Sequence, residues 1–268
     1  MSARPNALEP TLLAALEALA RRERVLVALD FDGTLAPEVD DPERARALPE
    51  ALDALLRLRA QPGMLVALIS GRSLASLAAV GGLPDDAPLV GSHGLEVRFA
   101  AGDARPAVDA ADRERVRALR SRLEPLVAPT AGAWIEDKPA GFAVHTRLVD
   151  PAAAAALVDT VRAEAHAVDP GLTVRDGKNV VEFSVRDATK GDGLRALRER
   201  FAPDAVLFAG DDVTDEDAVA VLEPGDVGIK VGAAPTAAAH RVAGPAEVAA
   251  LLHALASARD ALGVRSVD

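Results

Sequence analysis

The chain has 268 residues, half of them apolar, and it carries 41 acidic and 30 basic side chains, a formal charge of −11. This length accommodates one large domain or two smaller ones. The negative charge argues against nucleic acid and anionic membranes as partners, and an anionic substrate would need a metal ion or nearby basic residues to reverse the field. The absence of cysteine excludes disulfides and thiolate-bound metal.

Targeting signals are not evident in the sequence. No apolar run approaches the ~20 residues that a membrane helix requires. The segment MSARPNALEP lacks the apolar stretch of a secretory signal. We therefore expect a cytoplasmic protein that does not bind membranes.

Helices and buried strands alternate through the first hundred residues. The segment 11–24 has the apolar spacing of a helix and leads into VLVAL (Val25–Leu29), which is apolar on both faces, as a central strand of a parallel sheet is. A helical pattern over 50–63 is followed by a buried strand over 64–70. A short helix then precedes a third strand and its loop, over 87–94.

The same alternation returns downstream, with helical patterns over 190–204, 213–223 and 244–262 and strand patterns over 205–212 and 225–232. Alternation of this kind predicts an α/β fold with a doubly wound, Rossmann-like parallel sheet. Ligands of such sheets bind outside the carboxyl ends of the strands. The polar clusters of this sequence fall at those ends.

The middle of the chain follows a different order. Helical patterns over 112–128 and 151–168 each precede a pair of strand patterns, over 134–148 and 172–185. This order, αββαββ, is typical of a small α+β domain.

We therefore predict two domains. An α+β domain over residues 99–186 is inserted into a first domain made of residues 1–98 and 187–268. The linkers fall near 99–105 and 185–189.

Two aspartates, Asp30 and Asp32, stand at the end of the first predicted strand. Residues two apart in a strand point to the same side, and neighbouring carboxylates repel each other and need a cation. A hard divalent ion held by oxygen atoms, most simply Mg²⁺, meets that need. A solvated turn rich in aspartate is the alternative, but the apolar flanks of the pair make it a poor one.

A second acidic cluster, GDDVTDED, follows the buried segment AVLFA. Asp211 and Asp212 therefore reach the same edge of the sheet as the first pair, and Asp215 falls in the first turn of a helix, where the dipole favours acidic groups. Helix capping explains Thr214 or Asp215 but not the pair at the strand end.

Ser70 and Lys190 complete this edge of the sheet. Ser70 and the Gly71 amide follow a buried strand at the start of a helix, which is an arrangement that binds anions. Lys190 opens a helix, where the dipole disfavours a cation, so it fits best beside a carboxylate and a phosphate. Taken alone, each residue has an ordinary structural explanation.

The order Asp-x-Asp, Ser, Lys, Asp-Asp resembles the haloacid dehalogenase superfamily of phosphatases. The resemblance implies that Asp30 is a nucleophile that forms an aspartyl phosphate. It implies that Asp32 acts as general acid and then as general base. Ser70 and Lys190 would bind the transferring phosphoryl group.

The same resemblance implies a Mg²⁺ site. The Asp30 carboxylate, the backbone carbonyl of Asp32 and Asp211 would hold the ion, with Asp212 and Asp215 as outer ligands.

Within this resemblance, the inserted domain between the Ser70 and Lys190 motifs looks like a cap over a catalytic core of residues 1–98 and 187–268. Charged residues on the hairpins of this cap are candidates for binding sugar hydroxyls. Together with LDFDGTLAP, GSHGLEVR and GDDVTDED, the segments IEDKPAGFAVHTR and DGKNVVEFSV resemble trehalose-6-phosphate phosphatases, over about Arg24 to Ala256. This resemblance implies hydrolysis of trehalose 6-phosphate to trehalose and phosphate, the second step of trehalose biosynthesis. It assigns Glu136, Lys138 and Glu182 to glucose hydroxyls. The expected substrate-binding residues are Arg72, His93, Gly94, Glu136, Lys138, Lys178 and Glu182.

The chain departs from that family in two places. Thr146 stands where members often have tyrosine, and Phe183-Ser184-Val185 replaces a basic residue and proline. Glu136 and Lys138 could also belong to an ordinary solvated strand edge. We expect Trp134 to lie in the core, although its position before Glu136 leaves a sugar-stacking role open as the alternative, and we expect His145 to have no chemical role.

Other functions remain open at this stage. The alternative enzyme is a phosphatase for sucrose phosphate or mannosylglycerate phosphate. The alternative class is a phospho-accepting signalling domain, and a third is a structural relative without activity that serves a synthase. The expected ligand is a small sugar phosphate, a trehalose-phosphate synthase is a possible partner, and we expect a monomer.

Overall fold

The computed structural model describes residues 8–39, 41–105, 108–177 and 179–263, and these form two compact units. The first unit contains the described residues up to Arg105 and from Thr189 onward, and the second contains those between. We describe each unit by itself.

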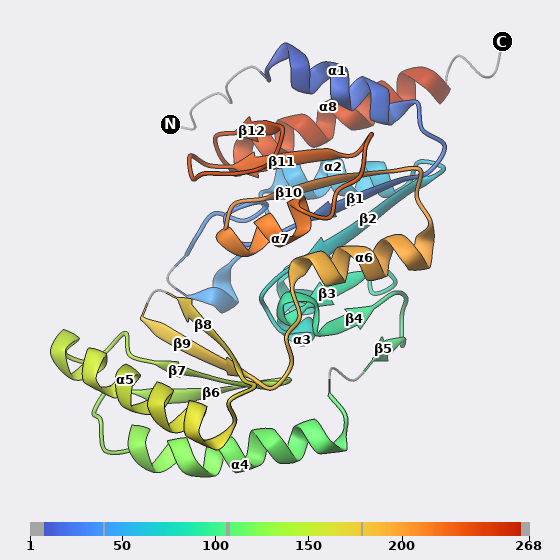
Figure 1. Ribbon diagram of the computed structural model, residues 1–268. Coiled ribbons are helices and arrows are strands. Elements are labelled where there is room, and N and C mark those ends of the chain that lie inside the picture. The colour runs from blue at the N-terminus through green and yellow to red at the C-terminus, as the bar shows by residue number, and fades with distance from the viewer. Residues whose placement is uncertain (1–7, 40, 106–107, 178, 264–268) are drawn as a thin grey trace. The chain divides into compact units, whose positions relative to one another are not determined.

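The first unit contains a mixed sheet that is parallel in its centre (Figure 1). Its order among the described residues is β12-β11-β10-β1-β2-β3-β4-β5, parallel from β12 to β3 and antiparallel beyond. The strands are β1 (Val25–Leu29), β2 (Met64–Ile69), β3 (Leu89–Gly91), β4 (Glu96–Arg98), β5 (Ala104–Arg105), β10 (Ala205–Gly210), β11 (Val227–Val231) and β12 (His240–Val242).

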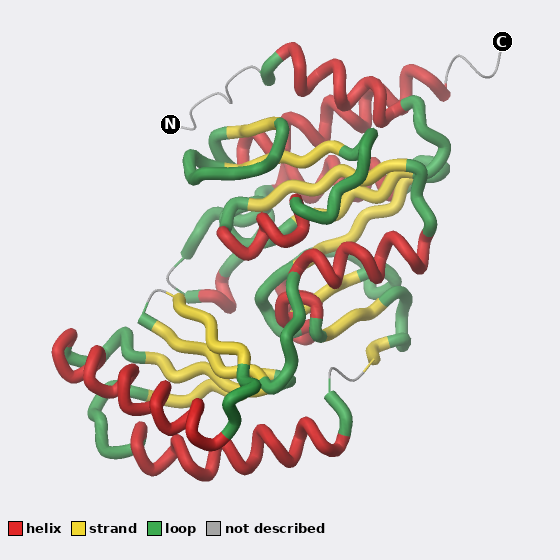
Figure 2. The backbone as a smooth tube through the Cα atoms, in the orientation of Figure 1, coloured by secondary structure: helices red, strands yellow, loops and turns green. Residues whose placement is uncertain are grey.

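Both faces of this sheet are covered by helices (Figure 2). On β1, Val27 and Leu29 join the hydrophobic core that includes residues of α1, α2, α3 and α8, whereas Leu26 and Ala28 join the core that includes α6 and α7. The predicted doubly wound α/β core is thus confirmed. The helices are α1 (Pro10–Ala20), α2 (Pro49–Arg59), α3 (Leu74–Val80), α6 (Lys190–Phe201), α7 (Glu216–Val219) and α8 (Pro245–Gly263), with 3₁₀ turns η1 (Pro42–Arg44), η2 (Ser92–Gly94) and η3 (Val213–Asp215).

Two details differ from the sequence prediction. The predicted cap began at residue 99, but Phe99 is buried beside Phe201, with ring centroids 6.0 Å apart, and β5 pairs with β4, so this segment belongs to the first unit. The helix predicted over 213–223 is instead η3 followed by the short α7, because the Asp212 side chain caps a tight turn there.

The second unit is a four-stranded antiparallel sheet with two helices on one face (Figure 1). The strand order is β6-β7-β9-β8, and the sequence order αββαββ agrees with the prediction. The elements are α4 (Ala110–Val127), β6 (Trp134–Lys138), β7 (Gly141–His145), α5 (Pro151–Val168), β8 (Thr173–Gly177) and β9 (Val180–Ser184).

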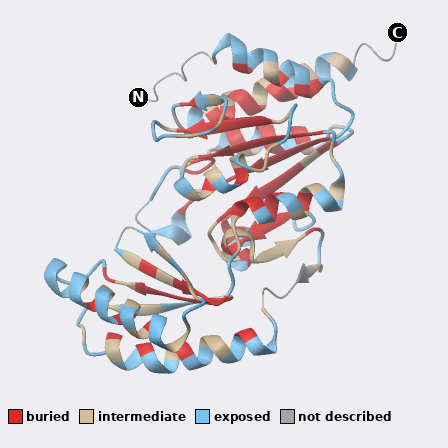
Figure 3. Cartoon of the chain, in the orientation of Figure 1, coloured by how far each residue is buried: buried red, intermediate tan, exposed pale blue. Residues whose placement is uncertain are grey.

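Side chains of this sheet alternate between its two faces. The helix-covered face carries Phe142, Val144, Val181 and Phe183, which pack with α4 and α5 in one core. Figure 3 colours the buried stretches of these strands red. A Cβ atom on Gly141 would lie 1.8 Å from the Phe183 carbonyl oxygen, so only glycine fits where β7 and β9 approach. The residues at alternate positions, including Glu136 and Glu182, therefore share the opposite face, called here the open face because no described helix of the second unit covers it.

The described helices include none with both the length and the apolar character needed to span a membrane.

The core of the second unit should depend on Phe183, whose side chain is fully buried. Truncation to alanine leaves a cavity, so Phe183→Ala should lower the free energy of unfolding of this unit by about 3–5 kcal/mol, measured by urea denaturation. Val174 stands opposite Phe183 in the strand register but is 39% exposed. Val174→Ala should therefore cost much less, and equal losses from the two variants would contradict the assignment of Phe183 to the core.

Candidate active site

Three neighbouring strands of the first unit end in polar residues. Asp30 follows β1, Ser70 follows β2 and Asp211 follows β10, and β1 is paired in parallel with both other strands. Parallel strands that start in register end at the same edge of the sheet. The fold therefore gathers these side chains, as the sequence predicted for strand ends.

A buried lysine stands among the carboxylates. The Lys190 ammonium lies 2.8 Å from Asp30 Oδ1 and 2.7 Å from Asp215 Oδ1, and all three side chains are buried. Thr189 caps α6 in a capping box with Asp192, which fixes Lys190 as the first residue of the helix. The helix start thus delivers the ammonium to the carboxylates.

Burial and mutual repulsion shift the protonation of this cluster. Burial raises the pKa of Asp30 well above its usual value, and Asp215 and Asp211 add to the rise while Lys190 opposes it. Burial likewise raises the pKa of Asp211. Burial alone would lower the pKa of Lys190, but Asp30 and Asp215 outweigh it and raise that pKa. The site therefore favours additional positive charge.

Three carboxylates can share one cation at this place. Ligand oxygens of Asp30, Asp211 and Asp215 lie within 4.8 Å of one another. The Thr34 hydroxyl lies 3.3 Å from both Asp30 Oδ2 and Asp211 Oδ1, and it can donate its single hydrogen to one of them at a time. An all-oxygen set with excess negative charge fits a hard divalent cation such as Mg²⁺.

The carboxylate beside Asp30 and Asp211 is that of Asp215, whereas the sequence analysis named Asp212 and Asp215 together as outer ligands. Asp212 is exposed and uses its side chain to accept the Val213 amide at 2.7 Å. The Asp212 amide donates to Asp215 Oδ2 at 2.9 Å, so the turn directs Asp215 inward and Asp212 outward.

Lys230 is a buried residue of this site that the sequence analysis missed. Its ammonium lies 3.0 Å from the Asp212 carbonyl oxygen and 3.5 Å from Glu216 Oε1, which links β11 to the acidic turn. Its place within the apolar strand VGIKV was the available signal, because lysine is rarely fully buried without a partner.

Asp32 forms an ion pair with Arg72. The Arg72 guanidinium donates to both carboxylate oxygens of Asp32 at 2.6 Å and lies 5.5 Å from the centroid of the Phe31 ring. The pair occupies both oxygens, so a proton transfer by this carboxyl requires that at least one of these hydrogen bonds open.

The Ser70 turn is held by the loop that follows β3. The His93 amide donates to the Ser70 carbonyl, and the His93 ring fills the space beside Gly71, where a Cβ would lie 2.6 Å from it. Gly94 has a positive φ of 106°, and a Cβ there would lie 2.3 Å from the Thr189 carbonyl oxygen. This loop thus packs closely on both the Ser70 turn and the start of α6.

The predicted helix start at Ser70 lies further along the chain. Helix α3 begins at Leu74, whose amide donates to Glu96 Oε2 at 2.8 Å. The Ser70 hydroxyl accepts the Arg72 amide at 3.1 Å. Ser70 therefore contributes its hydroxyl to the site, without the first-turn amides of a helix.

The second unit carries a separate polar cluster on the open face. Glu136, Ala143, Glu182 and Arg175 are aligned across its four strands. Lys138 Nζ and His145 Nε2 lie 2.6 Å and 2.8 Å from the two oxygens of Glu136. The predicted Lys178 lies outside the described residues.

The two glutamates of this row titrate differently. The hydrogen bond with His145, helped by Lys138, lowers the pKa of Glu136 to about 2, against the effect of burial. Burial raises the pKa of Glu182, although Lys138 and Arg175 oppose the rise.

Trp134 does not lie in the core, where the sequence analysis expected it. Trp134 is 41% exposed and stacks on the His145 ring, with centroids 4.5 Å apart and planes 5° from parallel. The period-two pattern of β6 puts Trp134 on the same face as Glu136, away from the core.

The departures from the expected family pattern lie inside the second unit. Thr146 is buried and its hydroxyl donates to the Asn179 carbonyl at 3.2 Å. Phe183 is in the core, and the Ser184 hydroxyl donates to the Arg186 carbonyl at 2.8 Å.

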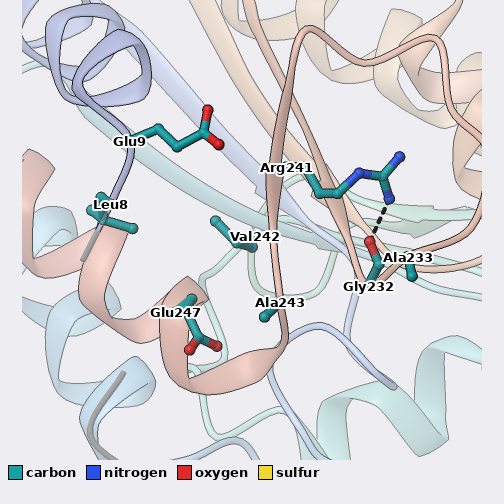
Figure 4. Close-up of a pocket in the computed structure, with 8 residues that line it drawn as sticks. All are labelled: Leu8, Glu9, Gly232, Ala233, Arg241, Val242, Ala243 and Glu247. Atoms are coloured by element: carbon teal, nitrogen blue, oxygen red, sulfur yellow. Dashed lines mark hydrogen bonds between the residues drawn. The ribbon is translucent and has the colours of Figure 1, made fainter. Parts of the chain in front are cut away.

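Two pockets of the first unit lie beside this edge of the sheet. A pocket of about 360 Å³ borders Gly33 and Asp211. A second, of about 400 Å³, contains none of the predicted site residues, and in it Arg241 donates to the Gly232 carbonyl (Figure 4). The second pocket is lined by Leu8, Glu9, Gly232, Ala233, Arg241, Val242, Ala243 and Glu247.

Comparison with known proteins gives a consistent result. The chain matches the trehalose-phosphatase family over residues 28–249. It is 35% identical over 228 residues to a bifunctional trehalose-6-phosphate synthase/phosphatase of Thermoproteus tenax, covering 83% of this chain but 30% of that protein. It is 35% identical over 270 residues to a trehalose-phosphate phosphatase of Mycobacterium ulcerans, covering 93% of this chain and 67% of that protein.

The solved structure of Aspergillus fumigatus trehalose-6-phosphate phosphatase is similar to this one. Its TM-score is 0.68 at 28% identity, over 95% of this chain and 99% of that chain. The likeness confirms the predicted fold class, an α/β core with an inserted α+β domain.

Gly33 should be essential for the carboxylate cluster. Its φ is +76°, and a Cβ would lie 2.1 Å from Asp211 Oδ2, so Gly33→Ala must displace that carboxylate. Mg²⁺ affinity, measured by isothermal titration calorimetry, should fall by about 10- to 100-fold, as for other changes that misplace a ligand.

Gly102 provides the matched control. Its φ of +77° imposes the same backbone strain, but nothing lies within 4 Å of its Cβ position. Gly102→Ala should keep the Mg²⁺ affinity of the unchanged protein. An equal loss in both variants would show that backbone strain, and not the position of Asp211, is responsible.

Proposed function

Because the chain belongs to the trehalose-phosphatase family, we propose that it hydrolyses trehalose 6-phosphate to trehalose and phosphate, with Mg²⁺ as its metal ion. The observation that carries the proposal is the buried cluster in which Lys190 contacts Asp30 and Asp215 and Asp211 lies beside them. Clustered carboxylates with a cation are suited to phosphoryl transfer, because the charge of the phosphate must be neutralised at the reacting centre.

Asp30 is the proposed nucleophile. Its carboxylate attacks phosphorus and forms an aspartyl phosphate, which water then hydrolyses. The Lys190 ammonium on Oδ1 fixes the orientation of this carboxylate. An ammonium has three donors, of which Asp30 and Asp215 use two, so the third can bind a phosphoryl oxygen.

Asp32 is the proposed general acid and base. It protonates the leaving sugar oxygen and later takes a proton from the attacking water. Arg72 holds it in place through two hydrogen bonds, and one of them must open when Asp32 transfers a proton. The Ser70 hydroxyl can donate its hydrogen to a phosphoryl oxygen while its oxygen accepts the Arg72 amide.

Mg²⁺ would be held by the carboxylates of Asp30 and Asp211 and by the Asp32 backbone carbonyl, with Asp215 nearby and Asp212 only as part of the supporting turn. When bound, the ion supplies positive charge that offsets the negative charge of the carboxylates and the phosphoryl oxygens. Thr34 and Lys230 position the ligand-bearing segments.

The open face of the second unit is the proposed site for the sugar. Glu136 and Glu182 accept hydrogen bonds from hydroxyls, and Lys138 donates to them. A site built to bind hydroxyls discriminates strongly against ligands that lack them, because its polar groups are then left unpaired. His93 and Gly94, with Arg72, shape the Ser70 side of the first unit.

A synthase is a further proposed partner. The Thermoproteus tenax relative is named as a bifunctional synthase and phosphatase, so the two activities occur in one chain there. We propose that this protein acts as a cytoplasmic monomer and that it consumes the product of a trehalose-phosphate synthase.

The function is tested by phosphate release from four esters, with Mg²⁺ and with EDTA. Trehalose 6-phosphate should be hydrolysed in preference to sucrose 6-phosphate, mannosylglycerate phosphate and an aryl phosphate, and EDTA should abolish the reaction. Asp30→Asn is the control and should lose at least ~10³-fold in kcat, because it removes the nucleophile. Preference for another ester would overturn the substrate, and a stable phosphoprotein without turnover would favour the signalling alternative.

Glu182 should contribute to recognition of the disaccharide. Glu182→Gln removes a charged hydrogen-bond acceptor worth about 1.5–3 kcal/mol, so kcat/KM for trehalose 6-phosphate should fall by roughly 10- to 150-fold, and by less for an aryl phosphate. Asp176→Asn is the control, because Asp176 lies on the other face of the same hairpin and pairs with Arg162. An equal fall in kcat/KM for trehalose 6-phosphate and for the aryl phosphate would show that Glu182 does not bind the sugar.

A further inference from the structure

Trp134 occupies an unusual position for a tryptophan. It is the only tryptophan in the sequence, and it is 41% exposed on the open face of the second unit. Its neighbours along β6 show which way it points, because Ile135 packs against the core of this unit and Asp137 pairs with Arg120 of α4. Leaving part of so large an apolar ring in water forfeits burial energy, and a ligand that covers the ring would recover it.

The Trp134 ring packs against a hydrogen-bonded neighbour. One of its faces lies against the His145 imidazole, with the planes 5° from parallel. His145 Nε2 is fixed in turn by Glu136 Oε2 at 2.8 Å, and the other Glu136 oxygen is bound by Lys138 at 2.6 Å. Because one face of the indole is covered by His145, its exposed area belongs to the other face and the ring edges.

The open face has two rows of different character. The strand register aligns the charged row, which contains Glu136 and Glu182, beside a row with little charge that begins with the indole. The second row consists of Trp134, His145, Val180 and Gly177, and the charged row consists of Glu136, Ala143, Glu182 and Arg175.

A pyranose ring is matched to this pair of rows. Its C–H faces are apolar and flat, whereas its hydroxyls project from the edge. A pyranose ring stacked on the indole therefore presents its edge hydroxyls to the neighbouring carboxylates and ammonium. Small-molecule sites commonly combine aromatic side chains with a few well-placed polar groups in this way. Phosphate or an aryl group would satisfy only one of the rows.

We propose that Trp134, backed by His145 and Glu136, is a stacking platform for a pyranose ring of a glucoside ligand. The proposal rests on the proposed function in that the ring would be part of its substrate. It adds a specificity-determining aromatic contact to the hydroxyl-binding residues. His145 is a positioning residue, since it acts on both the indole and Glu136.

The single tryptophan makes the proposal measurable without turnover. Emission of Trp134 in the intact protein is titrated with the neutral disaccharides trehalose, sucrose and maltose and, separately, with inorganic phosphate. At least one disaccharide should give a saturable change in emission, and phosphate should give none. No saturable response to any of the disaccharides would overturn the platform, whatever ester the enzyme hydrolyses.

Two variants of Trp134 distinguish aromatic stacking from simple filling of space by an apolar side chain. Trp134→Leu should weaken binding of the responsive disaccharide by about 3- to 10-fold by calorimetry, and Trp134→Phe should recover most of the affinity because an aromatic face is restored. Val174→Ala removes a similarly exposed apolar side chain from the opposite face of the sheet and should leave the affinity unchanged. Unchanged affinity in Trp134→Leu, or equal loss in the leucine and phenylalanine variants, would contradict stacking.

Phosphate release tests the catalytic proposal independently of disaccharide binding. A protein that binds a disaccharide through Trp134 but releases no phosphate from trehalose 6-phosphate would retain the platform and lose the proposed function. A protein that hydrolyses trehalose 6-phosphate with the same KM in Trp134→Leu as in the unchanged protein would retain the function and lose the platform.

Discussion

The contact of one ammonium with two buried carboxylates governs the candidate active site of this protein. Lys190 lies between Asp30 and Asp215, and Asp211 adds a third carboxylate within 4.8 Å. Repulsion between unscreened charges at such distances is large in a buried environment. A single lysine cannot balance three ionised carboxylates, so the cluster is suited to bind a further cation.

The groups of this cluster lie close together because glycine residues stand where a larger residue would collide with them. A Cβ on Gly33 would reach the Asp211 carboxylate, a Cβ on Gly210 would lie 2.1 Å from Asp215, and a Cβ on Gly191 would lie 2.4 Å from the Asp217 carbonyl oxygen. Each glycine sits beside a residue of the cluster or its supporting turn. The loops at the strand ends can therefore approach more closely than larger residues would permit.

The sequence alone predicted the strands and the strand-end residues, because these depend on local apolar pattern. Runs such as VLVAL identify central strands, and the rule that parallel strands end together places Asp30 beside Asp211. The sequence could not predict which side chains meet where strand register or turn geometry determines the contact. Asp215, and not Asp212, points inward because of the cap in η3, the Arg72 pair spans 40 residues, and His145 meets Glu136 only through the antiparallel pairing of β6 with β7. Trp134 could have been placed from its period-two relation to Glu136.

The effect of Mg²⁺ on the thermal stability of the protein tests whether the cluster carries excess negative charge. Thermal unfolding of the protein and of Asp211→Asn is followed with and without Mg²⁺. The unchanged protein should gain stability with Mg²⁺, because the ion binds only the folded state. Asp211→Asn should be at least as stable as the unchanged protein without Mg²⁺, because one repulsive carboxylate is gone, and should gain little from the ion. Stabilisation of both proteins by Mg²⁺ to the same extent would contradict the account.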